Sequence, residues 1–269
     1  MQDSLAQRYG ADSPVFTQPE GDAATVVAGL LRHRSVRRFT DRHVDDSVLH
    51  TLVAAAQSAS TSSNLQCWSV IVVRDRDRIE SLVEAGASAF VGEVPVVLVF
   101  VADWSRAAGI AERSGATASG LDYLEMTLVG FVDAALAAQN ATVAAEAMGL
   151  GACYLGSLRN APVQIAADLH LPERCTVAFG LALGYPASGH ERPLKPRLPR
   201  EVVMHQEVYR ERPDEVEAYA DRLDEYYASI GRPEASWRRD VIAKVRDAAG
   251  LRGRDTMRDS LAAQGLPSN

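Results

Sequence analysis

Apolar and polar residues follow two different periods along the first two thirds of the chain. Helical spacing predicts helices over residues 23–31, 46–59 and 76–85. Short runs rich in β-branched residues predict buried strands over Trp68–Val73, 95–102 and 176–183. Because strands and helices alternate, we expect an α+β domain in which helices pack on a central mixed or antiparallel sheet.

One predicted helix, over residues 121–148, differs from the others in having almost no polar face. Between Leu128 and Ala138 only Asp133 carries a charge. A helix that is apolar on nearly every side must be buried on nearly every side. One sheet covers a single side, so we expect this long central helix to lie at a homodimer interface. Gly149 and Gly151 are expected to end it, one of them in a left-handed conformation.

The two ends of the chain differ from this core. The first 20 residues show no periodicity and predict an irregular arm lying over the surface or over a partner subunit. Beyond Pro213, amphipathic patterns predict three charged helices, over residues 216–227, 237–249 and 256–264. We therefore expect an arm (1–21), a core (22–200) and a C-terminal helical extension integrated with that core (201–269).

Composition narrows the class of protein. There are 28 basic and 35 acidic residues, a net charge of −7, and 47% of residues are hydrophobic. These values predict an ordinary globular protein with no nucleic-acid partner. The longest apolar run, 94–102, is too short for a membrane helix, so we expect a cytoplasmic location and no membrane partner. Three cysteines without C-x-x-C spacing predict neither a disulfide framework nor a metal site.

Basic residues nevertheless gather in two places. The first cluster, within residues 32–38, follows the first predicted helix and includes Ser35 among its cations. The second consists of Lys195 and Arg197, in a loop over residues 191–200 that three prolines stiffen. Hydroxyl and guanidinium donors together suit a phosphate group, although a solvated surface explains either cluster alone. A third polar stretch, residues 60–68 (Ser-Thr-Ser-Ser-Asn-Leu-Gln-Cys-Trp), suits either a polar turn or a flat heterocycle. No G-x-S-x-G or P-loop motif occurs, and the G-L-G of Gly149–Gly151 follows a helix, unlike a dinucleotide-binding turn.

Taken in order, these pieces resemble the nitroreductase family, in its branch of oxygen-insensitive NADPH nitroreductases and flavin reductases P. The resemblance rests on these stretches: HRSVRRFT at 33–40, the 60–68 stretch, AAQN at 137–140, YLGSLRN at 154–160, FGLALGYP at 179–186, LKPRLP at 194–199 and EYY at 225–227.

The resemblance implies a nitroreductase-like α+β sandwich that forms a homodimer and binds FMN at the subunit interface. NADPH or NADH would reduce the flavin, and a nitroaromatic, a quinone or free flavin would reoxidise it in ping-pong two-electron steps. No side chain would be catalytic in its own right, because the chemistry takes place at N5 of the flavin. The implied FMN contacts are His33, Arg34, Ser35, Arg37, Lys195 and Arg197 around the phosphate, ribityl chain and pyrimidine; Thr61, Ser62, Ser63 and Asn64 from the other subunit; and Tyr154, Leu155, Gly156 and Ser157 along the isoalloxazine.

The chain departs from the branch at three places. Ser88 stands where relatives carry a glutamine, Ser157 stands for a glycine, and of the arginines that hold the 2′-phosphate of NADPH only Arg232 precedes Trp237. Two alternatives to a nitro- and quinone-reducing enzyme stay open. One is a flavin reductase that supplies reduced FMN to a partner, and the other, suggested by Ser88 and Ser157, is a flavin-binding protein without catalytic activity.

Overall fold

The computed structural model describes residues 1–269 except 11–16, 18 and 190–192, so parts of the predicted arm and of the 191–200 loop lie outside the described residues. The chain divides into two compact units. Unit 1 comprises Met1–Arg34 and Ser188–Gly250, and unit 2 comprises Ser35–Ala187 and Leu251–Asn269. The predicted division at residues 21 and 200 stays a prediction.

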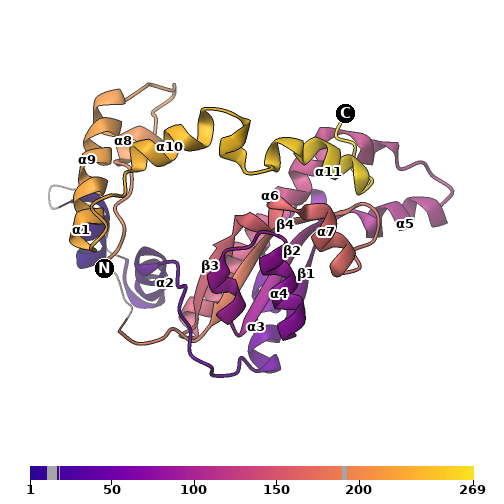
Figure 1. Ribbon diagram of the computed structural model, residues 1–269, viewed down its shortest axis with the longest axis horizontal. Helices are drawn as coiled ribbons and strands as arrows, with labels where there is room; N and C mark the ends of the chain where they lie inside the picture. Colours follow the sequence, from indigo (N-terminus) through magenta and orange to yellow (C-terminus); the bar gives the residue numbers. More distant parts are fainter. Residues whose placement is uncertain (11–16, 18, 190–192) are drawn as a thin grey trace. The chain divides into compact units, whose positions relative to one another are not determined.

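Unit 2 is built on a four-stranded antiparallel sheet with strand order β1-β2-β4-β3 (Figure 1). The strands are β1 (Trp68–Val73), β2 (Val96–Asp103), β3 (Gly151–Leu155) and β4 (Cys175–Gly184). All eight residues of β2 are buried, because it is a central strand covered on both faces. Leu98 and Phe100 point into one core and Val97 and Val99 into the other, as the two-residue period of a strand requires.

Helices form the outer layers of this sandwich (Figure 1). One core lies against α3 (Asp46–Gln57) and α6 (Leu124–Ala147), and the other against α4 (Arg76–Glu84) and α7 (Pro162–Asp168). The remaining helices of the unit are α5 (Ser105–Arg113), which follows β2, and α11 (Met257–Ala263) near the C-terminus. The predicted α+β fold and the three predicted strands are confirmed to within two residues.

Helix α6 is the long helix predicted from its lack of charge. It contacts α3 and all four strands, and the single charge of its apolar stretch, Asp133, is 1% exposed. Leu128 and Val132 remain 52% and 56% exposed within one chain, so the predicted cover by a second subunit on this side stays a prediction. By length and hydropathy α6 is long and apolar enough to cross a membrane, but here it is a core helix of the sandwich with one apolar face left uncovered.

Gly149 and Gly151 have separate roles after α6. Gly149 adopts φ +80°, the left-handed conformation predicted for one of them. Gly151 instead begins β3, where a Cβ atom would lie only 2.6 Å from the Val36 side chain.

Unit 1 consists of helices. They are α1 (Gln2–Tyr9), α2 (Gly21–Arg32), α8 (Arg200–Val203), α9 (Pro213–Ser229) and α10 (Trp237–Val245). The prediction of an irregular N-terminal arm is wrong for α1, which buries Leu5 and Arg8. Trp237 of α10 packs edge-on against Tyr219 of α9, with ring centroids 5.1 Å apart.

Candidate flavin-binding site

The basic motif of residues 33–40 begins at the end of unit 1 and continues from Ser35 in unit 2, where it meets the free edge of the sheet at β3. Its second half pairs with β3 and the chain after β4: Val36 N–H donates to Ala152 O at 2.9 Å, and Thr40 N–H donates to Tyr185 O at 2.8 Å. This pairing brings Ser35 and Arg37 beside β3, the strand that leads into Tyr154, Leu155, Gly156 and Ser157.

Arg37 and Ser35 of the basic motif act on the Cys153 side chain of β3. Burial raises the pKa of the Cys153 thiol, and the charge of Arg37 together with a hydrogen bond from Ser35 opposes that rise. Arg37 is exposed and makes no ion pair among the described residues. An exposed guanidinium and hydroxyl beside a strand end can therefore bind an anion such as a phosphate.

Tyr154 is anchored to α6. Its hydroxyl lies 3.2 Å from Thr142 Oγ1 and donates to Gln139 Oε1 at 3.4 Å, while its ring packs on Phe179 at 5.4 Å. Burial is the main reason that the pKa of Tyr154 is raised, so it stays a neutral phenol. These contacts fix the side chain at the start of the Tyr154–Ser157 segment.

The 60–68 loop, residues Ser60 to Trp68, is held in an uncommon backbone conformation. Ser63, Asn64 and Gln66 have φ of 48°, 56° and 50°. Left-handed residues other than glycine each cost roughly 1–2 kcal/mol, so they persist only where surrounding contacts impose them.

One set of such contacts comes from α6. Asp133 Oδ1 accepts the Ser62 N–H at 3.0 Å, and its Oδ2 accepts the Cys67 thiol at 3.2 Å. Burial, followed by this hydrogen bond, raises the pKa of Cys67 to about 12. The loop is thus attached at both of its ends to one buried carboxylate.

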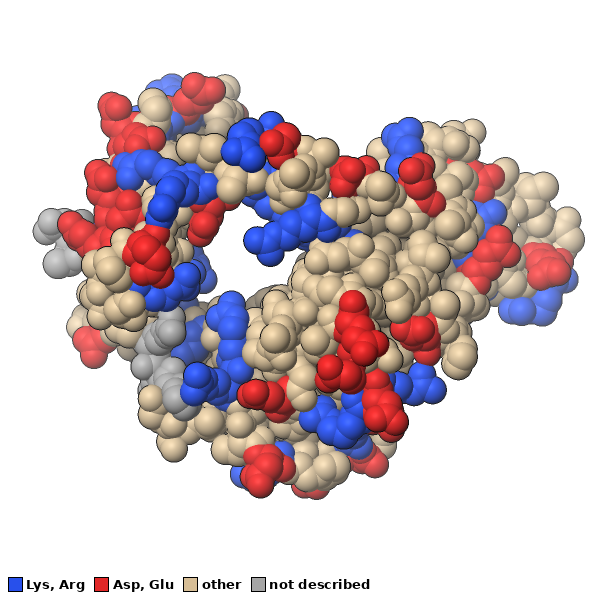
Figure 2. Space-filling view, viewed as in Figure 1, with Lys and Arg blue, Asp and Glu red and all other residues tan. Residues whose placement is uncertain are grey.

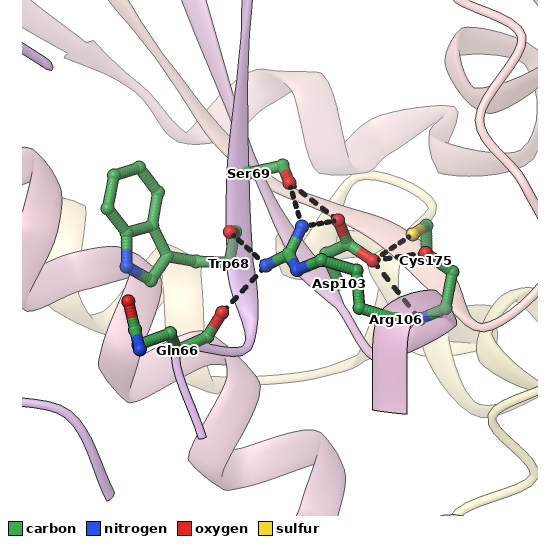
Figure 3. Close-up of polar contacts among 7 residues, drawn as sticks. Gln66, Trp68, Ser69, Asp103, Arg106 and Cys175 are labelled. Atoms are coloured by element: carbon green, nitrogen blue, oxygen red, sulfur yellow. Dashed lines mark hydrogen bonds and ion pairs between the residues drawn. The ribbon is translucent and has the colours of Figure 1, made fainter. Parts of the chain in front are cut away.

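A second set comes from the start of α5 (Figure 3). Arg106 Nη2 donates to Gln66 O at 2.7 Å and to Trp68 O at 2.8 Å, while its Nη1 donates to Ser69 Oγ at 2.7 Å and to Asp103 Oδ2 at 2.6 Å. The guanidinium of Arg106 therefore joins the end of the loop to the sheet.

Asp103 completes this cluster and is 6% exposed. It also accepts hydrogen bonds from Cys175 at 3.0 Å, Ser105 and Ser69 (Figure 3). Burial opposes its ionisation, but the three hydrogen bonds and the charge of Arg106 outweigh burial and lower the pKa of Asp103. Asp103 is consequently ionised at neutral pH, next to the guanidinium of Arg106.

Within one chain the structure does not bring the 60–68 loop to Tyr154. Asp133 holds the loop and Thr142 holds Tyr154, and these residues are nine positions apart on α6. Nine residues correspond to about 14 Å along the axis and two and a half turns. The two segments therefore contact opposite sides of α6.

The remaining predicted cations lie in unit 1. Exposure alternates along residues 194–197: Leu194 and Pro196 are buried, while Lys195 and Arg197 are exposed. Helix α9 holds this segment, since Tyr226 donates to Pro193 O at 2.9 Å. Arg197 makes no ion pair among the described residues. His33 and Arg34 follow the last turn of α2 in the same unit.

Arg232, the predicted contact for the NADPH phosphate, and Arg238, which follows Trp237, differ in their surroundings. Arg238 is held by the carboxylates of Glu217 at 2.7 Å, Asp221 at 2.9 Å and Asp224 at 3.7 Å. Arg232 is half-exposed, lies 3.8 Å from the Glu234 carboxylate and has its guanidinium carbon 5.8 Å from the centroid of the Tyr227 ring. Acidic and basic side chains are intermingled over the face that α9 and α10 occupy in Figure 1 (Figure 2). Of these two, Arg232 has the less occupied guanidinium.

Sequence reasoning missed the residues that hold the site in place. Asp133 was noticed as a solitary charge but assigned no role, and Asp103 and Arg106 were not singled out. A lone aspartate in an apolar helix is the one signal that pointed to a buried anchor, because a buried carboxylate must be hydrogen-bonded.

Comparison with known proteins identifies the family of the chain. Residues 30–185 match the "Nitroreductase family" and residues 195–269 match "Nitroreductase family, C-terminal domain". The NADPH-flavin oxidoreductase of Vibrio harveyi is 39% identical over 220 residues, 80% of this chain and 89% of that protein. The oxygen-insensitive NADPH nitroreductase of Salmonella typhimurium is 40% identical over 214 residues, 79% of this chain and 85% of that protein.

Solved structures lead to the same assignment. NfrA2 of B. megaterium superposes with a TM-score of 0.85 at 34% identity, covering 91% of this chain and 98% of that one. The NADPH:FMN oxidoreductase of Vibrio harveyi complexed with NAD⁺ gives a TM-score of 0.80 at 35% identity, covering 91% and 99%. The chain belongs to the nitroreductase family.

Proposed function

We propose that the protein is an FMN-dependent NAD(P)H oxidoreductase that reduces nitroaromatics, quinones or related acceptors by ping-pong two-electron transfer. The observation that carries the proposal is the pairing of Ser35–Val36 with β3, which sets an exposed hydroxyl and guanidinium beside the Tyr154–Ser157 segment. Relatives named NADPH-flavin oxidoreductase and FMN reductase (NADPH) support it.

Each unit, taken by itself, offers groups that fit FMN. Arg37 and Arg197 are exposed guanidinium groups without an ion pair among the described residues, in a chain whose net charge is −7. Such groups suit the phosphate of FMN, and Ser35 adds a hydroxyl donor. His33, Arg34 and Lys195 complete the proposed polar set.

The bound flavin supplies hydride acceptance from a nicotinamide and two-electron donation to the acceptor. The chain's own groups bind and orient. The cations would hold the phosphate and favour negative charge on the reduced flavin, and Tyr154, Leu155, Gly156 and Ser157 would contact its ring system.

A second chain completes the site in this proposal. The side chains of Leu124, Leu128, Val132 and Leu136 form a half-exposed apolar stripe along α6. Removing such a stripe from water favours association with an identical stripe of a second copy. Thr61, Ser62, Ser63 and Asn64 of one chain would then reach the flavin of the other, which accounts for their place on the far side of α6 from Tyr154.

The experiment is to record the absorption spectrum of the purified protein and then to measure FMN retention in variants. We expect yellow protein with about one FMN per chain. Arg37→Ala and Arg197→Ala each weaken binding by about 2 kcal/mol, the value of one charge-assisted contact. Arg38→Ala is the matched control, since the resemblance gives it no flavin contact. Colourless protein that does not take up FMN contradicts the proposal.

Two other functions remain to be separated from this one. A flavin reductase would turn over free FMN much faster than nitrofurazone or a quinone in steady-state assays, and one relative carries the name FMN reductase (NADPH). A flavin-binding protein without activity, suggested by Ser88 and Ser157, would bind FMN without oxidising NADPH. A cytoplasmic location also stays a prediction.

A further inference from the structure

Helix α1 lies outside the residues that match the nitroreductase family, which begin at residue 30. It nevertheless packs into unit 1 through a buried side, formed by Ser4, Leu5 and Arg8. Arg8 is 4% exposed. Burying a guanidinium is costly unless its donors are satisfied, so its hydrogen bonds define where the helix sits.

The Arg8 side chain holds the main chain at Leu31 and His33, next to the predicted phosphate contacts His33 and Arg34. Its Nε donates to Leu31 O at 2.8 Å, and its Nη2 donates to His33 O at 2.7 Å. These carbonyls lie at the C-terminal end of α2, where a cation is also favoured by the helix dipole. Arg8 thereby fixes the main chain immediately before Arg34.

The main chain of Arg8 and the side chain of Gln7 hold residues 194–197, which include the cations Lys195 and Arg197. Arg8 O accepts the Arg197 N–H at 2.9 Å, and Gln7 Oε1 accepts the Leu194 N–H at 2.9 Å. Lys195 lies between these two anchored positions. The main chain that carries the exposed Lys195 and Arg197 side chains is thus held in place by α1, and the Lys195 ammonium lies 5.4 Å from the centroid of the Tyr227 ring.

Helix α9 also binds both the end of α1 and the 194–197 segment. Arg222 Nη1 donates to Tyr9 O at 2.9 Å, and its Nη2 donates to Arg197 O at 2.7 Å and to Arg8 O at 3.3 Å. The end of α1 and the 194–197 segment are therefore bound to each other and to α9 within one unit.

We propose that α1 is a clamp for the flavin phosphate, with Arg8 as a positioning residue that fixes His33–Arg34 and Lys195–Arg197 relative to each other. The inference rests on the proposed function, because it assigns these cations to FMN. Cations that are already in place lose less conformational freedom when the phosphate binds, so the clamp raises affinity for FMN without touching it.

The test compares two flavins that differ only in the phosphate. The full-length chain, freed of flavin, is titrated with FMN and with riboflavin by fluorescence quenching. Arg8→Ala is expected to weaken FMN binding about tenfold, a loss comparable to one charge-assisted contact. Riboflavin binding is expected to change less than about twofold, because the clamp acts through phosphate-binding cations.

Two further variants keep the test informative if Arg8→Ala does not fold. Gln7→Ala removes only the anchor of Leu194 from an exposed side chain and is expected to weaken FMN binding about threefold, the loss of one neutral hydrogen bond. Asp3→Asn, on the exposed side of the same helix, is the control and is expected to leave both flavins unchanged.

The outcomes separate the clamp from the proposed function. Equal losses for FMN and riboflavin, or unchanged FMN binding in both Arg8→Ala and Gln7→Ala, overturn the clamp. A wild-type chain that binds neither flavin overturns the proposed function instead. Selective loss of FMN affinity in Gln7→Ala, with Asp3→Asn unaffected, supports the clamp.

Discussion

Arg106→Met is the substitution that tests how the 60–68 loop is held. Methionine keeps part of the aliphatic stem but removes the guanidinium, which donates to Gln66 O, Trp68 O, Ser69 Oγ and Asp103. Two main-chain carbonyls of the loop lose a charged donor. Asp103 loses its ion pair but keeps hydrogen bonds from three neighbouring side chains.

The size of the effect follows from burial. Removing one partner of a fully buried ion pair costs about 3–5 kcal/mol. The Arg106 side chain is 51% exposed, so solvent screens part of its interaction with Asp103. We expect the free energy of unfolding to fall by about 2 kcal/mol, between the values for an exposed and a buried pair.

The assay is urea unfolding with FMN in excess, followed by circular dichroism at several pH values. The folded-state pKa of Asp103 is lowered from its ordinary value of 3.8, so its ionisation stabilises the fold above that pH. This contribution is lost as the pH falls through the lowered pKa. The difference between wild type and Arg106→Met should therefore be complete at pH 7 and shrink below pH 3.8.

Arg113→Met is the matched control, because Arg113 lies exposed at the end of the same helix. It should change the free energy of unfolding by less than about 0.5 kcal/mol. If Arg106→Met behaves like Arg113→Met, or if its effect is as large at low pH as at pH 7, the assigned role of the ion pair is wrong.

Three further predictions concern reactivity, assembly and donor choice. Burial and the neighbouring carboxylates raise the pKa of Cys67 and Cys175 to about 12. A thiol reagent at pH 8 should therefore modify neither cysteine in the native protein and both after denaturation, and rapid labelling of either in the native protein contradicts this. Val132→Asp places a charge in the exposed stripe of α6 and should give a monomer in sedimentation that loses FMN, whereas a monomer that retains FMN rules out the shared site. Wild type should prefer NADPH by about 5- to 30-fold in kcat/KM, and Arg232→Ala should abolish that preference; an unchanged ratio places the phosphate contact elsewhere.

The sequence predicted those elements whose residues carry their own periodic signal. Strands β1 and β2 were found because their β-branched runs are short and unbroken, and α6 was found because it lacks charge over many turns. Helices α1 and α5 were missed. Each has eight or nine residues, a length at which an isolated helix is marginal and tertiary contacts decide whether it forms.

For the candidate site, the sequence by itself determined which chemical groups are present: the cations, the hydroxyl-rich loop and the segment that begins at Tyr154. Only the tertiary structure decided which groups face one another. Ser35 meets Ala152, and Gln7 meets Leu194, across more than a hundred residues, and no local pattern encodes such pairings. The burial of Asp133 and the left-handed loop residues beside it have the same origin, because a strained conformation persists only where contacts from distant segments impose it.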